Sequence, residues 1–486
     1  MNNVIRRESS IRKQRWHAAA LPAFLFAGLL ATPGLCKSQT MQPANEAAPV
    51  SPLYSSSLPN QASANADPGA PETITLQDAI QRAQKIYSPY LATVTDAQVA
   101  REDALQARNG MLPSFGYTQQ FLGTQGNGKT PSGRFVTNDG VHVYRLWGVM
   151  HQDIPAGFFT GASYKRAQAV AAFTEAKQEI ARRGLVVAVT RNFYTLIAAQ
   201  RKYATAQQTA GEALHFFEDT TNLEKGGEVA HADVVKAQLQ FNQQKVALRE
   251  AELAMDNAHL ALAVMVSPTF DQNFTAVDEM DNMPPLPPLP ELRELAAREN
   301  QDIHAAMQAL LQANADVSIA RAGFLPTFSL DAVYGIEANA IALDSAEAAA
   351  KGLGPLPNLG YFVTASANVP IWNWGTTRSK LKQAQLRRAQ ARADLTQTQR
   401  EALSNFYSFY NEAGTARSEV NMLRDAADEA AESLRLSTLR YRAGEATALE
   451  VVDAQTTLAG ARNALADGEA RYRVALASLQ TLTGRF

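Results

Sequence analysis

The sequence is poor in the features that mark enzymes, disulfide-stapled proteins and nucleic-acid-binding proteins. Its 486 residues include one cysteine, Cys36, which excludes an intramolecular disulfide framework. The net charge of −2 supplies no basic field, so we expect no nucleic-acid partner. Gly-rich phosphate loops, nucleophile elbows and Cys/His metal clusters are also missing from the sequence. We therefore expect no enzymatic activity, no cofactor and no metal site.

The N-terminus has the pattern of an export signal. Five basic residues between Arg6 and Arg15 precede an apolar run from about residue 18 to residue 35. This order predicts a signal peptide over residues 1–36. An uncleaved membrane helix is the alternative, although the run is short for a membrane span.

The position of Cys36 after the apolar run also raises the possibility of a lipoprotein. Pro33-Gly34-Leu35 is a poor match to the small residue that usually precedes a lipidated cysteine. We expect Cys36 to leave with the signal peptide or to lie beside the cut. Residues 37–72 are rich in Ala, Ser, Pro and Asn and have few large apolar residues, which predicts a disordered spacer.

Four short segments recur in the same order, about 213 to 217 residues apart. The pairs are Leu112-Pro113-Ser114-Phe115 with Leu325-Pro326-Thr327-Phe328, Ile154-Pro155 with Val369-Pro370, Asn192-Phe193-Tyr194 with Asn405-Phe406-Tyr407, and Gly227-Glu228 with Gly444-Glu445. Ordered matches at a nearly constant offset indicate an internal duplication. We expect a first structural repeat over 73–283, a stiff Pro-rich linker over 284–290 and a second repeat over 291–486.

Each repeat is predicted to run helix, strand, strand, helix, helix. The first helix is expected over 76–112 in one repeat and 289–325 in the other, each stopped by the proline that follows. The next helices, at about 161–224 and 376–442, contain no proline and would each span roughly 100 Å. The last helix of the first repeat, about 230–266, covers about half of that length.

Four segments near residues 115–121, 141–149, 328–336 and 361–369 alternate apolar and polar residues. Strands of about ten residues with one apolar side are typical of a membrane-spanning β-barrel, and the edge of a soluble sandwich is the alternative. Arg145 interrupts the apolar row of the segment 141–149, and the sequence leaves open which face of the strand carries it. Four strands cannot close a membrane barrel, so a barrel would have to pool strands from several chains. Long polar connections over 122–140 and 337–360 suit the outer face of such a barrel.

The final helix of each repeat carries a heptad pattern. Large residues recur every seven positions, and mostly small residues follow three positions later: Val451, Leu458, Leu465, Tyr472 and Leu479 with Ala454, Ala461, Gly468, Ala475 and Leu482, and Val234, Phe241, Leu248, Met255 and Leu262 with Ala237, Gln244, Ala251, Ala258 and Met265. Such rows allow close approach of helices in a coiled-coil sheet or tube. An ordinary two-stranded coiled coil is the alternative, which the embedded strands disfavour.

Taken together, the duplicated element order, the paired Leu-Pro-Ser-Phe and Leu-Pro-Thr-Phe segments and the stretch from Tyr441 to Gln455 resemble the TolC family of outer-membrane efflux proteins. The resemblance covers residue 73 to the C-terminus. It implies a mainly α fold with a membrane β-barrel, in which each chain of a homotrimer gives four strands to a twelve-stranded barrel, surrounded by outer-membrane lipid and continued into the periplasm by a helical tube.

The resemblance also implies the function. The protein would be the passive exit duct of a tripartite efflux system in a Gram-negative outer membrane, coupled through a periplasmic adaptor to an inner-membrane pump of the RND or ABC type. The docking turns would be Gly226-Gly227 and Ala443-Gly444. A duct for type I protein secretion or metal efflux stays open, and a periplasmic coiled-coil scaffold is the alternative from another class.

Glu450 and Asp453 are spaced i, i+3, so we expect both on one face of the helix that leaves the second turn. By the resemblance they match the carboxylates of a closed periplasmic gate, where three chains would place six acids around one constriction. A solvated helix face is the alternative. The resemblance assigns Asp233 and Tyr441 to links that hold the entrance shut. The expected basic partner is replaced by Ala446, and Lys236 could supply another cation to Asp453.

Overall fold

The computed structural model describes residues 72–123, 142–269, 273–338, 341–348 and 355–484. Residues 67–486 form one compact unit, and the following description concerns this unit alone. The predicted signal peptide, Cys36 and almost all of the predicted spacer lie outside the described residues.

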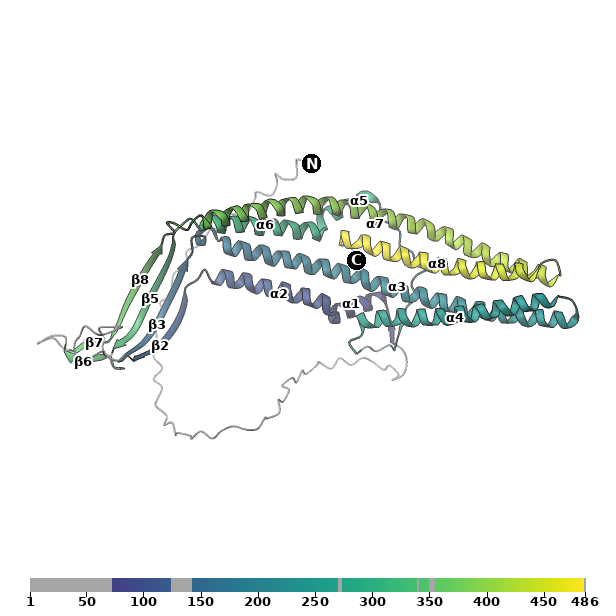
Figure 1. The fold of residues 1–486 in the computed structure, drawn as a ribbon, viewed down its shortest axis with the longest axis horizontal. Helices are drawn as coiled ribbons and strands as arrows, with labels where there is room; N and C mark the ends of the chain where they lie inside the picture. Colours follow the sequence, from purple (N-terminus) through teal and green to yellow (C-terminus); the bar gives the residue numbers. More distant parts are fainter. Residues whose placement is uncertain (1–71, 124–141, 270–272, 339–340, 349–354, 485–486) are drawn as a thin grey trace, which may run out of the picture. The chain divides into compact units, whose positions relative to one another are not determined.

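The two halves of the unit have the same order of main elements (Figure 1). The first half contains α1 (Leu76–Ile86), α2 (Ser88–Asn109), β2 (Ser114–Gly123), β3 (His142–Ile154), α3 (Ala162–Gly226) and α4 (His231–Val266), and the second half contains α5 (Leu289–Glu299), α6 (Gln301–Ala322), β5 (Thr327–Ala338), β8 (Leu359–Asn368), α7 (Thr376–Arg442) and α8 (Ala448–Thr483). Corresponding helices agree in length, with 65 and 67 residues in α3 and α7 and 36 in both α4 and α8.

The single helix predicted at the start of each half is wrong, because the structure has two helices there. The chain leaves the helical region at Tyr87 and at Asn300, where the backbone is extended. At the first break Pro89 lies in the first turn of α2, a position that tolerates a missing N–H. At the second break the Asn300 side chain accepts a hydrogen bond from the Ile303 backbone N–H at 3.0 Å and starts α6 as its N-cap.

The four main strands form one antiparallel sheet in the order β2-β3-β5-β8. Residues directly opposite one another share a face. One face is mainly apolar and aromatic and carries Phe115, Tyr117, Phe121, Tyr144, Leu146, Leu330, Tyr334, Tyr361 and Val363. Arg145 lies on the other face, opposite Gln120 and Glu337, and its guanidinium binds Glu337 at 2.8 Å and Gln120 at 3.1 Å. The sheet therefore has one mainly apolar and one mainly polar face, and Arg145 belongs to the mainly polar one.

Two small strand pairs accompany this sheet. β1 (Glu72–Ile74) pairs in parallel with β4 (Phe274–Ala276), just before the segment that connects the two halves. β6 (Asp344–Ala348) pairs with β7 (Pro355–Pro357) inside the connection from β5 to β8, which the sequence predicted as a loop without strands.

The helices repeat the lateral order of the strands. Next to the sheet, α2, α3, α6 and α7 pack side by side in that order; farther along the long helices, α4, α3, α8 and α7 do so (Figure 1). α3 therefore has neighbours on both sides, whereas α7 has them on one side only. The chain ends laterally at β2, α2 and α4 on one edge and at β8 and α7 on the other.

The predicted heptad rows are confirmed as packing rows of α4 and α8. On α8, Val451, Leu458, Tyr472 and Leu479 are buried, and on α4 the two end members of the large row, Val234 and Leu262, are buried. The largest core cluster lies midway along α3, around Phe193 and Tyr194. Among the described helices, none is both long enough and apolar enough to cross a membrane.

Candidate channel entrance and the ion pairs behind it

The two helical turns close in the same way. Gly227 and Gly444 both have positive φ, of 78° and 75°. In the first turn the Glu228 N–H donates to the Leu223 carbonyl at 2.9 Å, and in the second the Glu445 N–H donates to the Arg440 carbonyl at 2.8 Å. These bonds satisfy the last carbonyls of α3 and α7 around a left-handed glycine. Each turn can therefore reverse the chain within a few residues.

Glu450 has partners at the start of α8. Its Oε1 accepts hydrogen bonds from the Thr447 backbone N–H at 3.2 Å and from the Thr447 hydroxyl at 3.3 Å, which forms a capping box. Its Oε2 lies 3.3 Å from a guanidinium nitrogen of Arg440, which also donates to the Glu445 carbonyl. The carboxylate thus fastens α8 to the end of α7.

The other predicted carboxylates are less engaged. Asp453 is exposed one turn beyond Glu450, and Asp233 lies half-buried in the first turn of α4. Neither carboxylate makes an ion pair or a side-chain hydrogen bond within the described residues. Lys236 is exposed and makes no ion pair with Asp453 in the described chain. The pairing of Lys236 with Asp453 is therefore not formed within one chain.

Tyr441 lies in an apolar cluster between α7 and α3 instead of beside the carboxylates. Its ring packs on Phe216 with 5.1 Å between centroids, and the cluster also includes Ala237, Ala448 and Val451. The buried hydroxyl donates to the Thr220 hydroxyl at 3.4 Å. The structure therefore separates the four predicted gate residues into an exposed carboxylate face and a buried tyrosine.

Two polar contacts join α7 to α3 near the turns. One is the bond from Tyr441 to Thr220, and the other is the ion pair from Arg442 on α7 to Asp219 on α3, at 3.5 Å. Sequence reasoning overlooked Arg440 and Arg442, the cations that form ion pairs with Glu450 and Asp219 near the second turn. The sequence did contain a signal for them, because both residues flank Tyr441 in the last turn of α7. Positive charge is stabilising near the C-terminus of a helix.

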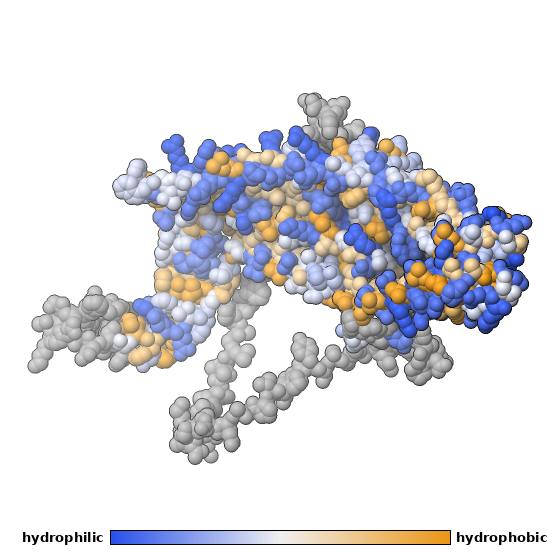
Figure 2. Space-filling model, turned by 45° about the vertical axis from the view of Figure 1, so that its right-hand side comes forward, coloured by the Kyte–Doolittle hydropathy of each residue, from blue (hydrophilic) through white to orange (hydrophobic). Residues whose placement is uncertain are grey.

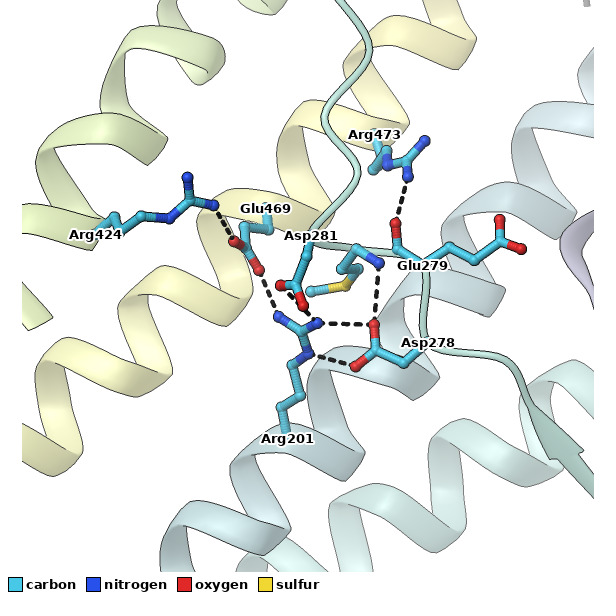
Figure 3. Close-up of polar contacts among 8 residues, drawn as sticks. Arg201, Asp278, Glu279, Asp281, Arg424, Glu469 and Arg473 are labelled. Carbon is cyan, nitrogen blue, oxygen red and sulfur yellow. Dashed lines mark hydrogen bonds and ion pairs between the residues drawn. The ribbon is translucent and has the colours of Figure 1, made fainter.

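Behind the entrance, Arg201 of α3 binds three carboxylates from other elements (Figure 3). It contacts Asp278 at 2.6 and 2.8 Å, Asp281 at 3.0 Å and Glu469 of α8 at 2.7 Å. Burial opposes the charge on Arg201, but its carboxylate partners outweigh that effect and raise its pKa above the ordinary value. Asp278 and Asp281 lie in the segment that connects the two halves.

Glu469 is the centre of this network because its side chain is only 1% exposed. Its second oxygen accepts a hydrogen bond from Arg424 of α7 at 3.1 Å. One buried carboxylate therefore holds cations from α3 and α7 at once. Nearby, Arg473 donates to the Glu279 carbonyl at 2.5 Å (Figure 3). Tyr472 donates to the Pro284 carbonyl, also at 2.5 Å, and the two bonds fix the connecting segment against α8.

A second arginine of α3 donates hydrogen bonds to carbonyls at the ends of two helices in the second half. Arg183 donates to the Glu299 carbonyl at 3.0 Å, at the end of α5, and to the Thr481 carbonyl at 2.7 Å, near the end of α8. Glu179 holds the Arg183 guanidinium at 2.8 Å. Buried carbonyls at helix ends need such donors. No group of three or more His, Cys, Asp or Glu that could hold a metal occurs in the part of the chain that the structure describes.

With this fold and these turns, the class of protein is defined. The profile of the family described as "Outer membrane efflux protein" matches residues 76–266 and 292–485, well over half of the chain, and the chain belongs to this family. It is accordingly an outer-membrane protein, and the resemblance deduced from the sequence is confirmed.

The sequence identity to individual relatives is low. The chain is 28% identical over 191 residues to "Outer membrane protein TolC" of Escherichia coli (strain K12), in an alignment that covers 39% of this chain and only 37% of that relative. It is 24% identical over 434 residues to "Pyoverdine export outer membrane protein OpmQ" of Pseudomonas aeruginosa, covering 86% of this chain and 85% of the relative.

Solved structures show the same fold. The Campylobacter jejuni CmeC outer membrane channel superimposes with a TM-score of 0.72 at 16% identity, covering 84% of this chain and 85% of that chain. The open state of the Neisseria gonorrhoeae MtrE outer membrane channel gives a TM-score of 0.70 at 22% identity, covering 84% and 89%. The fold class deduced from the sequence, long coiled helices with a four-stranded contribution to a barrel, is the fold of these channels.

Proposed function

We propose that the chain is one subunit of a passive, homotrimeric exit duct in a tripartite efflux system. Three chains would pool their strands into a twelve-stranded barrel in the outer-membrane lipid, continued by helices into the periplasm. The turns at Gly226-Gly227 and Ala443-Gly444 would dock on a periplasmic adaptor bound to an inner-membrane pump of the RND or ABC type.

The observation that carries this proposal is the pair of open lateral edges. In lipid, every backbone hydrogen-bonding group must be satisfied, so the outer sides of β2 and β8 need partners. Four strands are too few for a barrel, since about eight are needed. Joining β8 and α7 of one chain to β2, α2 and α4 of the next gives a head-to-tail contact that can close into a ring. The two faces of the sheet fit an apolar outside and a polar lumen.

Reconstitution tests the assembly directly. Purified full-length chain in detergent should be a trimer that dissociates on heating, and it should conduct ions in a planar bilayer. A cysteine pair placed on β2 and β8, such as Gln119→Cys with Ala365→Cys, should crosslink between chains of the trimer, whereas either single variant should not. A stable monomer without conductance would overturn the proposal.

The entrance would be held closed by the contacts between the hairpins. The links from Tyr441 to Thr220 and from Arg442 to Asp219 keep α7 beside α3 where both helices approach their turns. Six carboxylates from Glu450 and Asp453 of three chains would then surround the constriction and favour cations. Asp233, one turn into α4, would contribute on the adjoining hairpin.

Two sets of variants distinguish the contribution of the latch, meaning the contacts of Tyr441 and Arg442 with α3, from that of the gate carboxylates. Tyr441→Phe with Arg442→Ala should raise the bilayer conductance, and Arg435→Ala is the matched control because Arg435 pairs only with Glu432 on its own helix among the described residues. Glu450→Gln with Asp453→Asn keeps the capping geometry and should lower cation preference and weaken block by multivalent cations. Unchanged conductance in the first set refutes the latch, and unchanged selectivity in the second refutes the carboxylate gate.

The cargo stays unassigned. Relatives of similar identity are named for pyoverdine export, toluene efflux and cation efflux, so cargo does not follow from relatedness at this distance. The comparisons give no preference to a duct for protein secretion or metal efflux, nor to a periplasmic scaffold. Crosslinking from the turns at Gly227 and Gly444 to an adaptor, followed by identification of its pump, would narrow the cargo class.

A further inference from the structure

All four junctions between the sheet and the helices expose apolar side chains. They are Leu112 between α2 and β2, Phe159 between β3 and α3, Phe324 between α6 and β5, and Trp374 between β8 and α7. Phe159 and Trp374 are 84% and 88% exposed, which is far more than large aromatic residues usually show. Figure 2 shows hydrophobic residues gathered in patches on the sheet as well as along the helices.

Each junction also carries an exposed cation three to six residues from its apolar side chain: Arg108, Lys165, Arg321 and Arg378. Lys380 and Lys382 follow on α7, also exposed. Within the described residues, none of these six cations makes an ion pair or a side-chain hydrogen bond. Some neighbouring cations do find partners: Arg166, which follows Lys165, pairs with Asp316 at 2.7 Å, and Arg101, farther from the sheet on α2, pairs with Glu175 at 2.6 Å.

The helix dipole explains only two of the six cations. Arg108 and Arg321 lie in the last turns of α2 and α6, where a cation complements the helix dipole. Lys165 and Arg378 lie in the first turns of α3 and α7, where the dipole disfavours positive charge, and Lys380 and Lys382 follow on α7. The first turns of both helices contain no acidic residue. An anion from outside the chain would offset this unfavourable interaction between the cations and the helix dipole.

The order of side chains along the molecule identifies the anion. An apolar sheet face comes first, then exposed aromatic side chains, then unpaired cations within about 9 Å of the start of α7. A lipid bilayer presents the same order as acyl chains, interface and headgroup phosphates, and Trp with nearby Lys or Arg is typical of that boundary. Anionic leaflets attract such cations strongly.

We propose that these junctions form a collar that binds the headgroup phosphates of anionic phospholipids in the periplasmic leaflet of the outer membrane. The collar comprises Arg108, Lys165, Arg321, Arg378, Lys380 and Lys382, and its interfacial anchors are Trp374 and Trp372, which is 75% exposed. It rests on the proposed function, which turns the apolar face of the sheet toward lipid. It adds a lipid class to that function and fixes the depth of the barrel in the membrane.

The test uses the full chain reconstituted into phosphatidylcholine vesicles with or without phosphatidylglycerol. Quenching of Trp372 and Trp374 by brominated phosphatidylglycerol and by brominated phosphatidylcholine is compared, and Trp372→Phe with Trp374→Phe assigns the signal. Arg378→Gln, Lys380→Gln and Lys382→Gln together should lower the preference for phosphatidylglycerol by on the order of tenfold. The matched control is Arg387→Gln, Arg388→Gln and Arg392→Gln, which removes three charges farther along the same helix and should leave that preference unchanged.

Equal quenching by the two lipids, or an equal loss in both triple variants, would overturn the collar. Absence of any quenching at Trp372 and Trp374 in an intact trimer would also overturn it, because the junctions would then be covered by a second copy of the chain. Conductance measured in the same vesicles separates the two proposals. A conducting trimer without lipid preference refutes the collar alone, whereas a chain that neither assembles nor conducts refutes the duct.

Discussion

α3 and α7 have equivalent places in the two halves of the chain and almost the same length, yet their surroundings differ. α3 packs against α2, α4, α6 and α8 and buries twenty residues, whereas α7 packs mainly against α6 and α8 and buries eight. α3 also carries three arginines that bind the other half, Arg166, Arg183 and Arg201. The duplication therefore produced one helix that packs at the centre of the chain and one with an uncovered side, which a neighbouring chain would cover in the proposed trimer.

The same contrast holds in the sheet. β3 and β5 are paired on both sides, whereas β2 and β8 are edge strands whose residues are almost all exposed. An edge strand with unpaired backbone groups is a liability in water and prohibitive in lipid. Interior elements should therefore respond to substitutions as parts of a folded chain, and edge elements as parts of an assembly.

The largest effect should come from the edge helix α4. Val235, Leu239, Val246 and Leu253 form an exposed stripe on the side opposite the row that begins with Val234, and Leu239 and Leu253 are 57% and 62% exposed. If a neighbour covers this stripe, each leucine contributes about 2 kcal/mol to the contact. Leu239→Ser with Leu253→Ser should abolish the trimer in native electrophoresis but leave the helix content by circular dichroism unchanged.

The buried Leu262 on the same helix provides the contrast. Leu262→Ala should lower the stability of the chain itself, by about 2 to 5 kcal/mol. If the serine variant assembles normally, α4 is not an edge that meets another chain.

The next largest effect should come from removing the Glu469 carboxylate. Glu469→Ala removes the carboxylate that binds Arg201 and Arg424 and leaves cations without their buried partner, which should cost about 3 to 5 kcal/mol in the free energy of unfolding. Asp467→Ala is the control, because its ion pair with Lys202 is exposed and should contribute less than about 1 kcal/mol. Denaturant unfolding of both variants in detergent measures the difference. Equal losses would show that the buried carboxylate is not what joins α3 to α7.

A smaller effect is expected from two glycines that lie opposite each other in the sheet, Gly335 on β5 and Gly360 on β8. A Cβ added at Gly335 would fall 2.0 Å from the Leu146 carbonyl oxygen on β3, whereas one added at Gly360 meets nothing within 4 Å in the described chain. Gly335→Ala should destabilise the sheet by about 1 to 3 kcal/mol, as overpacking does, and Gly360→Ala should be nearly neutral within the chain. Heat-dissociation temperatures of the two trimers compare them. Equal temperatures would remove the distinction between interior and edge strands.

The smallest effect concerns pH. The hydrogen bond from Arg182 is the main reason that the pKa of Glu179 lies below its ordinary value; burial works against this shift and Arg183 adds to it. A lowered pKa in the folded state gives stability that is present above the unfolded value of about 4.3 and is lost as pH falls through the folded pKa. The melting-temperature gap between the parent and Glu179→Gln should therefore close below about pH 4. A gap that persists or widens in acid contradicts this role.

Much of this architecture was accessible from the sequence, for identifiable reasons. Alternation with a period of two revealed the strands, prolines such as Pro113 marked where helices give way to them, and heptad rows predicted the packed faces of α4 and α8. Gly227 and Gly444 were recognisable because a left-handed residue after a long helix is most often glycine.

What the sequence did not reveal depends on contacts between distant residues. Asn300 looks like any polar residue in a helical pattern until its side chain caps α6, so the break there was overlooked. The arginine network joins residues more than two hundred positions apart, and no periodicity marks such pairs. Glu450 was predicted as a gate residue from its spacing with Asp453, but its capping box and its bond to Arg440 required the geometry of the turn.

The connecting segment described with Arg201 bears on how a duplicated chain stays together. Asp278, Asp281 and Pro284 are held by α3 and α8 through side-chain contacts, so the peptide link between the halves lies on a surface that already binds it. A chain opened after Met283 would leave both new ends fastened close to where the link had been. We therefore expect the two halves to associate even when they are supplied as separate polypeptides, in which case the covalent link would serve mainly to deliver them in equal numbers.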